Sequence, residues 1–181
     1  MPSSLSIYSQ IHRLSIKDDY IEWRYCSNNI NIRSHFSDKD WNYIVLDLNT
    51  DKELLQANKK GYLALYEVKA KGHAEPFGFA FVLVNDPQTR TVSVHGGAWD
   101  ASARHLFLHA YMLINIYLLD SGYRVRSSCS KENVRALRFI KSCGFRIYRY
   151  EDERILLYLS RPLLEKSLFY KRLESHSSVP H

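Results

Sequence analysis

The chain has 181 residues, of which 45% are hydrophobic and 13% aromatic, and this is enough apolar material for one well-buried core. Its 25 Lys and Arg residues exceed its 19 Asp and Glu residues, which gives a formal net charge of +6. No run approaches the ~20 apolar residues that cross a bilayer, and the first residues lack the basic-then-apolar order of a signal peptide. We therefore expect a soluble cytoplasmic protein with a single domain at residues 1–174 and a disordered tail at 175–181.

The cysteine and histidine positions disfavour a disulfide framework and a metal site. Cys26, Cys129 and Cys143 are odd in number and show no C-x-x-C pair, so we expect reduced thiols that are mostly buried. His105 and His109 are four residues apart, a spacing that metal sites on helices use, but no third ligand is evident. We predict no metal.

The first half of the chain is predicted to begin with a strand at 7–16 and a helix at 18–36. A second helix is expected from Ser37, because a serine followed by acidic residues suits the positive end of a helix, and it ends between residues 48 and 60. After Gly61 come three strands, separated by turns rich in Gly, Pro, Asn and Asp, at 62–68, 77–84 and 90–95. Short turns between neighbouring strands predict an antiparallel meander.

The second half alternates helices and strands. A long apolar helix at 102–119 leaves few polar positions and is expected to be largely buried. A short helix follows the next strand, with Ser130 as its cap and Gly144 in the left-handed conformation after its last turn. The remaining elements are strands at 123–127, 145–150 and 155–159 and a last helix at 162–172. Together they predict a mixed α/β fold, with a central sheet of about seven strands flanked by about four helices, plus a C-terminal helix.

The segment from Asn133 to Phe145 carries the most informative motif. Its spacing is N-x-x-A-x-x-F, formed by Asn133, Ala136 and Phe139, with Gly144 and Phe145 five and six residues after the Phe. This motif resembles the last helix and strand of the GNAT N-acetyltransferase superfamily. The order of the predicted elements across residues 5–160 is similar to the GNAT arrangement, so the resemblance implies a GNAT-like fold. A helix–glycine–strand unit by itself is common in other α/β proteins, and the element order narrows the choice.

The resemblance implies acetyl-CoA as co-substrate. In the family, the strand before the long helix separates from its neighbour and pairs with the pantetheine arm, and a glycine-rich turn at the helix start holds the pyrophosphate. Here that turn is eroded, because Asp100 occupies its Arg or Gln position. Two alternatives follow. Either the protein has lost its affinity for CoA, or it binds CoA through other groups, such as the helix end and the Arg104 side chain. The implied cofactor-binding residues are Val94, His95, Gly96, Gly97, Ala103 and His105 (in the two Gly positions of the turn), Arg104, Asn133, Phe139 and Arg138, with Arg135 as an alternative to Arg138 at the 3′-phosphate.

The implied reaction is transfer of an acetyl group to an amine, which needs a base for the amine and commonly an acid for the leaving thiolate. His95 is the candidate base, because it ends the central strand on the polar face; the alternative is a histidine bonded into a strand-end turn. The family's tyrosine acid has no counterpart, since its position holds Ile140. Tyr148 is our candidate acid in its place, with Tyr150 as a second option; the alternatives are that the thiolate leaves without an acid or that the protein is not catalytic.

The acceptor in this hypothesis is a small-molecule or peptide amine. Aromatic and acidic side chains of the first two predicted helices either line its site or are ordinary core and surface residues. These side chains are Trp23, Tyr25, Phe36, Trp41, Tyr43, Asp38, Asp40 and Asp47. The sequence leaves the oligomeric state open, with a homodimer as one option, and indicates no membrane partner.

Basic residues concentrate between residues 121 and 149, which carry a surplus of seven positive charges. Such a segment indicates an anionic partner, such as phosphates, nucleic acid or an anionic surface, or else a solvated helix face. Two alternatives to an enzyme stay open: a catalytically inactive GNAT-fold module that binds CoA or a protein, and a nucleic-acid-binding domain. We rank the second lower, because the segment lacks an aromatic-interleaved RNA motif.

Overall fold

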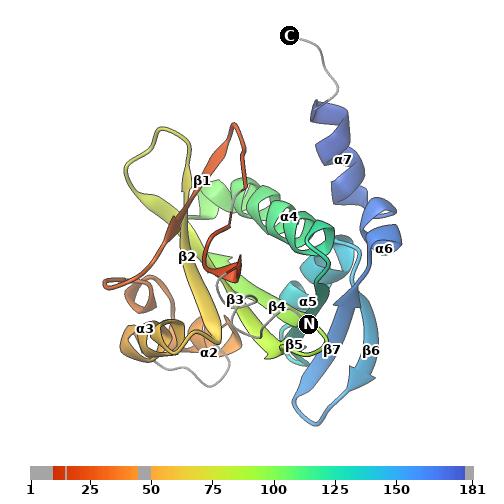
Figure 1. The fold of residues 1–181 in the computed structure, drawn as a ribbon, viewed down its shortest axis with the longest axis horizontal. Helices are drawn as coiled ribbons and strands as arrows, with labels where there is room; N and C mark the ends of the chain where they lie inside the picture. The colour runs from red at the N-terminus through yellow and green to blue at the C-terminus, as the bar shows by residue number, and fades with distance from the viewer. Residues whose placement is uncertain (1–9, 15, 45–49, 178–181) are drawn as a thin grey trace.

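The computed structural model describes residues 10–14, 16–44 and 50–177, and a single mixed sheet lies at its centre (Figure 1). The sheet has seven strands in the order β1-β2-β3-β4-β5-β7-β6. Strands β4 and β5 run parallel, and the other neighbours pair antiparallel. The strands are β1 (Ile21–Tyr25), β2 (Leu63–Ala70), β3 (Pro76–Asp86), β4 (Thr91–Ala98), β5 (Arg124–Ser130), β6 (Arg146–Tyr150) and β7 (Arg154–Leu159). The predicted fold class and the β2–β3–β4 meander are confirmed.

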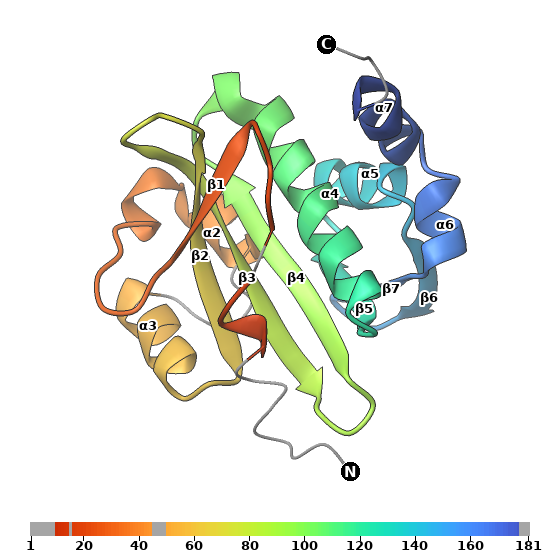
Figure 2. The same cartoon turned by 45° about the horizontal axis from the view of Figure 1, so that its top comes forward.

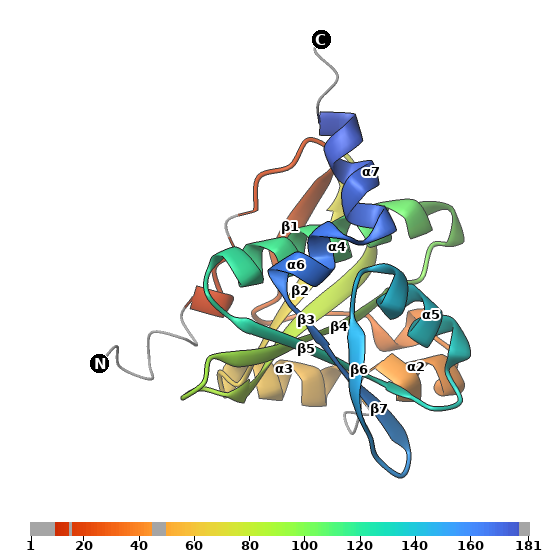
Figure 3. The same cartoon turned by 90° about the vertical axis from the view of Figure 1, so that its right-hand side faces the viewer.

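Helices cover both faces of the sheet (Figure 3). On one face α2 (Asp38–Ile44) and α3 (Asp51–Lys59) pack against β2 and β3 through a core that includes Trp41, Leu54 and Phe79. On the other face α4 (Arg104–Asp120) and α5 (Val134–Ser142) share a larger core with β4, β5 and β7. Figure 2 shows α4 running back alongside β4. The remaining helical segments are η1 (Arg33–His35), η2 (Ala101–Ala103), α6 (Arg161–Glu165) and α7 (Leu168–Ser177).

The predicted first strand and first helix are wrong in the described part of the chain. Gln10 and Ile11 are helical, residues 7–9 and 15 lie outside the described residues, and the first strand is β1. Only η1 is helical between residues 18 and 36. The physical reason is a turn at Asp18, whose carboxylate accepts the backbone N–H groups of Tyr20 at 2.8 Å and Ile21 at 2.9 Å. This turn directs the chain into β1, which pairs with β2 along its full length.

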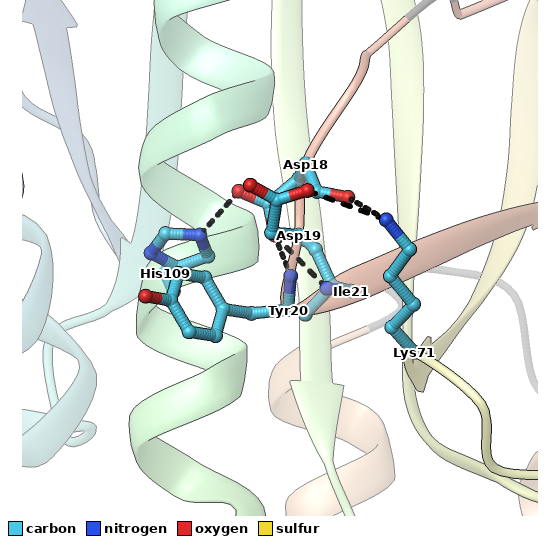
Figure 4. Close-up of polar contacts among 6 residues, drawn as sticks. All are labelled: Asp18, Asp19, Tyr20, Ile21, Lys71 and His109. Carbon is cyan, nitrogen blue, oxygen red and sulfur yellow. Dashed lines mark hydrogen bonds and ion pairs between the residues drawn. The ribbon is translucent and has the colours of Figure 1, made fainter. Parts of the chain in front are cut away.

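The same aspartate attaches β1 to α4 (Figure 4). Asp18 Oδ2 lies 2.7 Å from His109 Nε2, and both side chains are mostly buried, at 11% and 19% exposure. The ring of Tyr20 packs edge-on against the His109 ring, with centroids 5.5 Å apart. On the other side, Lys71 Nζ donates to the Asp18 carbonyl at 3.1 Å. His109 is therefore a structural partner of Asp18, and among the described residues no group of three or more potential metal ligands gathers.

Local sequence signals explain where the other helices begin and end. Thr50 caps α3 in a capping box with Glu53, so the single helix expected from Ser37 is two helices, α2 and α3, with residues 45–49 outside the described part. Asn133, and not Ser130, caps α5: its side chain accepts the Ala136 N–H at 3.0 Å. Gly144 has the predicted positive φ, +101°, where a Cβ would lie 2.7 Å from the Leu163 carbonyl oxygen.

The last predicted helix, at 162–172, is two helices, α6 and α7. Helix α7 continues to Ser177, three residues into the segment predicted to be disordered, and residues 178–181 lie outside the described part. All three cysteines are free and buried, and burial raises the pKa of the Cys26 and Cys143 thiols to about 12. No helix within the described ranges is long and apolar enough to cross a membrane.

Candidate functional site

The two parallel strands at the centre of the sheet separate part of the way along their length. Strands β4 and β5 are aligned only at Thr91–Arg124, Val92–Val125 and Ser93–Arg126. Beyond this point β4 stays paired with β3 as far as Ala98, and β5 stays paired with β7 as far as Ser130. The edge of β4 from residue 94 to residue 98 therefore has no strand partner on the β5 side within the described chain. Unpaired strand edges present N–H and C=O groups that a ligand can bind.

A cavity of about 450 Å³ opens where these strands separate. Its volume lies in the range of roughly 300–1,000 Å³ typical of small-molecule sites. It is bounded by residues from β4, β5, α4, α5 and the η1–α2 segment. The lining residues are His35, Phe36, Asp40, Tyr43, Ile44, Val94, His95, Gly96, Gly97, Ala98, Trp99, Arg104, Phe107, Tyr111, Ser127, Ser128, Cys129, Asn133, Arg135, Ala136, Phe139 and Ile140.

Glycines on β4 keep the strand close to its neighbours. A Cβ at Gly96 would lie 2.3 Å from the Phe79 carbonyl oxygen and 2.9 Å from Ala80 Cα, so only glycine fits against this backbone. A Cβ at Gly97 would meet side chains instead, at 3.0 Å from Ile44 and 3.4 Å from the Phe36 ring. The predicted residues Val94, His95, Gly96 and Gly97 all line the cavity, on the strand edge where the sequence placed them.

His95 is buried at 7% exposure and lies on the α2–α3 side of the sheet. Its ring stacks on Phe81 with centroids 5.1 Å apart, and its Nε2 is 3.1 Å from Ser93 Oγ. Burial lowers the pKa of His95 to about 4, and the nearby positive charge of Arg154 acts in the same direction. The imidazole is therefore neutral at physiological pH, with one ring nitrogen able to accept a hydrogen bond.

The start of α4 supplies a helix end and one positive side chain. Arg104 lines the cavity. Asp100 caps the preceding turn η2, where its carboxylate accepts the Ser102 N–H at 2.8 Å and the Ser102 hydroxyl at 2.7 Å. These bonds lower the pKa of Asp100, so its negative charge is held at this helix end. Ala103 is buried in a core cluster that includes Phe77 and Ala80, and His105 is exposed. Neither residue is part of the lining, so the His105 side chain does not fill the site.

Helix α5 presents a mixed surface to the cavity. Asn133 and Phe139 line it as the motif predicts, and Asn133 also caps the helix. Phe139 packs against Tyr111 at a centroid distance of 5.2 Å and against Phe107 at 6.4 Å, which fixes its ring between α4 and α5. Of the two arginines considered for a phosphate, Arg135 lines the cavity and Arg138 does not.

The proton donor suggested from sequence lies elsewhere. Tyr148 is 42% exposed on β6, where it contacts Arg126 and Tyr158, and it is not part of the cavity lining. Tyr150, the second option, is 65% exposed at the end of the same strand. The placement gives neither residue support as an acid. The tyrosines that belong to the cavity lining are Tyr43 and Tyr111.

Tyr111 and the residues of β5 are the part of the site that sequence reasoning missed. Tyr111 is 5% exposed, and burial raises the pKa of its hydroxyl, which also contacts Ser127. Ser127, Ser128 and Cys129 line the opposite wall. The sequence signal that could have located this wall is the run of small residues at 127–129 in β5, the strand opposite β4. Small side chains leave room for a ligand between two separated strands.

Aromatic and acidic side chains form the rim of the cavity beside η1, α2 and the end of β4. The sequence analysis expected such side chains if the site binds an amine. His35 stacks on Trp99 with centroids 4.3 Å apart and planes 10° from parallel. Phe36, Asp40 and Tyr43 also line the cavity. The other side chains considered for this role lie elsewhere: Trp41 is in the core, Trp23 packs against core residues, Tyr25 is on β1, Asp38 pairs with Arg33, and Asp47 falls outside the described residues.

The arrangement of strands and helices resembles solved GNAT acetyltransferases. A probable GNAT-family acetyltransferase from Chromobacterium violaceum ATCC 12472 has a TM-score of 0.65 and 15% sequence identity, covering 83% of this chain and 87% of that chain. The aminoglycoside acetyltransferase AAC(6')-Ib, in complex with coenzyme A and kanamycin, has a TM-score of 0.58 and 14% identity, covering 81% and 98%. Campylobacter jejuni N-acetyltransferase PseH has a TM-score of 0.53 and 13% identity, covering 78% and 98%.

No protein-family model and no curated protein matches the sequence. Sequence identities of 13% to 15% show a common fold and leave the substrate open. The seven-stranded order, the helices on both faces and the separated β4–β5 pair agree with the GNAT resemblance of the Asn133–Phe145 motif. The chain therefore has the fold of the GNAT acetyltransferases.

Proposed function

We propose that this protein is an acetyl-CoA-dependent N-acetyltransferase that acts on a small-molecule or peptide amine. The observation that carries the proposal is the separation of β4 from β5 after the Ser93–Arg126 pair, beside a cavity of about 450 Å³. A free strand edge next to a helix start suits a ligand that carries both amide groups and phosphates. Similar structures solved with coenzyme A support the choice of ligand.

The residues present fit such a ligand. The unpaired edge of β4 from Val94 to Ala98 offers backbone donors and acceptors to the pantetheine amides, and the glycines at 96 and 97 keep this edge free of bulk. Arg104 at the start of α4 and Arg135 on α5 are the positive groups of the lining, and we assign them to the phosphates. Asp100 holds a negative charge near the same helix end, so we expect weaker CoA binding than a glycine-rich turn would give.

The reaction would join the amine nitrogen to the acetyl carbonyl carbon and break the bond from that carbon to the CoA sulfur. The nitrogen loses a proton and the leaving thiolate gains one. Backbone N–H groups on the β4 edge would stabilise the negative charge that develops on the carbonyl oxygen. The acidic and aromatic rim at Asp40, Tyr43 and Trp99 would hold the cationic form of the amine before it reacts.

His95 and Tyr111 are our candidates for the proton transfers. A neutral His95 can accept a proton, but a pKa of about 4 makes it a weak base. We therefore propose that it orients the amine through a hydrogen bond and accepts the amine proton only once the new bond to carbon has formed and made the nitrogen more acidic. Tyr111 replaces Tyr148 as candidate donor because it lines the cavity. Its hydroxyl is protonated at neutral pH, as in any tyrosine, and burial raises its pKa further, which makes it a weaker acid than an exposed tyrosine. A His95→Gln change is expected to lower kcat more than it raises KM, and Tyr111→Phe to lower kcat with CoA binding retained.

The experiment that tests the proposal has two parts. Calorimetry with CoA and acetyl-CoA measures binding, and release of the CoA thiol in the presence of a broad panel of amines measures turnover. Binding with amine-dependent thiol release supports the enzyme. Binding without release for any amine would support the inactive binding module instead. No binding at millimolar concentration would reject a CoA site altogether.

A further inference from the structure

Strands β5, β7 and β6 form the half of the sheet that lies beyond the cavity, and one face of it is exposed. The register aligns Arg126 of β5 with Tyr158 of β7, and Tyr158 with Arg146 of β6. Arg124 is two residues before Arg126 on β5 and so points to the same face. Tyr148 joins this group through its contacts with Arg126 and Tyr158. We call Arg124, Arg126, Arg146, Tyr148 and Tyr158 the arginine–tyrosine face.

The face is open to solvent, because helices α4 and α5 pack on the opposite side. Residues that alternate with it, such as Val125 and Leu157, are buried in the core shared with α4 and α5. By contrast, the three arginines are exposed, and Tyr148 and Tyr158 are 42% and 41% exposed. This sheet face thus carries two large exposed aromatic side chains flanked by guanidinium groups. Such a group of side chains is a candidate interaction surface.

The arginines of this face are not neutralised by ion pairs within the described part of the chain, although the charge of Arg124 helps to lower the pKa of Asp86. Arg126 and Arg146 form no ion pair with the described residues, and the guanidinium of Arg126 lies over the Tyr148 ring at 5.1 Å. Most basic residues of the segment at 121–149 thus lie in two places: Lys131, Arg135, Arg138 and Lys141 on or next to α5, and the arginines of this face on the sheet. Arg149 is on β6 and pairs with Glu151. Since Arg135 is the only basic residue of this segment in the cavity lining, a CoA site does not account for the other basic residues.

We propose that the arginine–tyrosine face binds single-stranded nucleic acid. The guanidinium groups match phosphates in charge and geometry, and the exposed tyrosine rings, 6.3 Å apart and inclined at 70°, offer surfaces on which unpaired bases stack. A duplex hides the faces of its bases and heparin has none, so neither would use the tyrosines. The proposal does not depend on acetyl transfer, because it uses a different part of the sheet.

The experiment is fluorescence anisotropy of the full chain with a fluorescein-labelled oligouridylate 12-mer, at several salt concentrations. If three arginines each contact one phosphate, the slope of log K against log salt is about −2. The variant pair Arg126→Ala with Arg146→Ala is expected to weaken binding at least about tenfold. Tyr158→Leu is expected to weaken it about fivefold or more, and Tyr158→Phe to keep it, since the ring remains.

The matched control is Lys131→Ala with Lys141→Ala, which removes the same charge from exposed positions in and beside α5. It is expected to change affinity by less than about twofold. Equal loss in both double variants would overturn the proposal, because it would show a response to net charge alone. Competition with the duplex form of the 12-mer and with heparin is measured in the same assay. Equal affinity for all three, together with no effect of Tyr158→Leu, would overturn the proposal. The absence of any binding at low salt would overturn it as well. The arginine variants decide the matter even if Tyr158→Leu fails to fold.

Discussion

Ser93 and Arg126 are the last aligned pair of β4 and β5, and they separate two surfaces of this protein. Beyond them on β4 lie His95 and the cavity, whereas Arg126 itself belongs to the exposed face of β5, β7 and β6. One strand junction therefore positions both the proposed acyl-transfer site and the proposed nucleic-acid face. The two sites can be tested with separate substitutions.

The pH dependence of stability should show the burial of His95. The pKa of His95 is lowered from 6.5 to about 4 in the folded protein, so between these values the unfolded chain binds a proton that the folded protein excludes. The stability that neutral His95 contributes is present above about pH 6.5 and is lost as pH falls toward 4, by roughly 3 kcal/mol. Urea unfolding of the wild type and His95→Gln at pH 4.5 to 7 (about four values) measures it. A parallel decline in both proteins would contradict this prediction.

Arg135 and Arg138 make a matched pair for the phosphate prediction. Arg135 lines the cavity and Arg138 is exposed one turn along the same helix, outside the lining. Arg135→Ala should weaken CoA binding about fivefold to tenfold, because it removes a charge-assisted hydrogen bond, and Arg138→Ala should have little effect. Calorimetry with CoA and with dephospho-CoA separates the 3′-phosphate from the diphosphate. The assignment fails if Arg138→Ala is the more damaging change.

Gly96 and Gly97 differ in what surrounds them. Gly96→Ala would place a methyl group 2.3 Å from the Phe79 carbonyl oxygen, so β3 and β4 must move apart, and we expect a loss of about 1–3 kcal/mol in unfolding free energy. Gly97→Ala meets the Ile44 and Phe36 side chains, which can adjust, so its loss should be smaller. Thermal unfolding of both variants checks the order. A more stable Gly96→Ala variant would show that the strands are not held this closely.

Asp18 should contribute more to the free energy of unfolding than its neighbour Asp19. Asp18→Ala removes two backbone hydrogen bonds and the contact with His109, so we expect a loss of about 1–3 kcal/mol. Asp18→Asn keeps an oxygen acceptor for the backbone bonds and should cost less. Asp19→Ala is the control: its side chain is 95% exposed and pairs with Lys71 at 3.4 Å, so the change should be within about 0.5 kcal/mol. Equal effects at the two positions would exclude a special role for Asp18.

Local patterns predicted much of the fold. The left-handed Gly144 after α5 and the strand predicted at 90–95 are set by neighbours in sequence, and both appear as expected. Strand β1 was missed because the residues of β2 that pair with it are 41 to 49 positions away, and pairing across that distance overrides local preference. The expected cap at Ser130 moved to Asn133 because two adequate capping residues lie three positions apart.

The site was predictable where one strand or helix carries it and not where several elements meet. Val94 to Gly97 and Asn133 to Phe139 are each contiguous, and the family motif located them. Tyr111 and Ser127 reach the cavity from α4 and β5, and only packing brings them together. The same holds for the arginine–tyrosine face, since Arg126, Tyr158 and Arg146 come from three strands aligned by register. The depth at which His95 lies is likewise a result of packing, so its lowered pKa has no local sequence signal.

The most direct test of the central claim is a crystal structure of the protein grown with CoA or acetyl-CoA. The account predicts the pantetheine arm along the β4 edge between Val94 and Ala98, with its amide groups bonded to that backbone and the phosphates near Arg104 and Arg135. A structure in which CoA binds elsewhere, or in which β4 and β5 are paired throughout and no CoA enters between them, would contradict it.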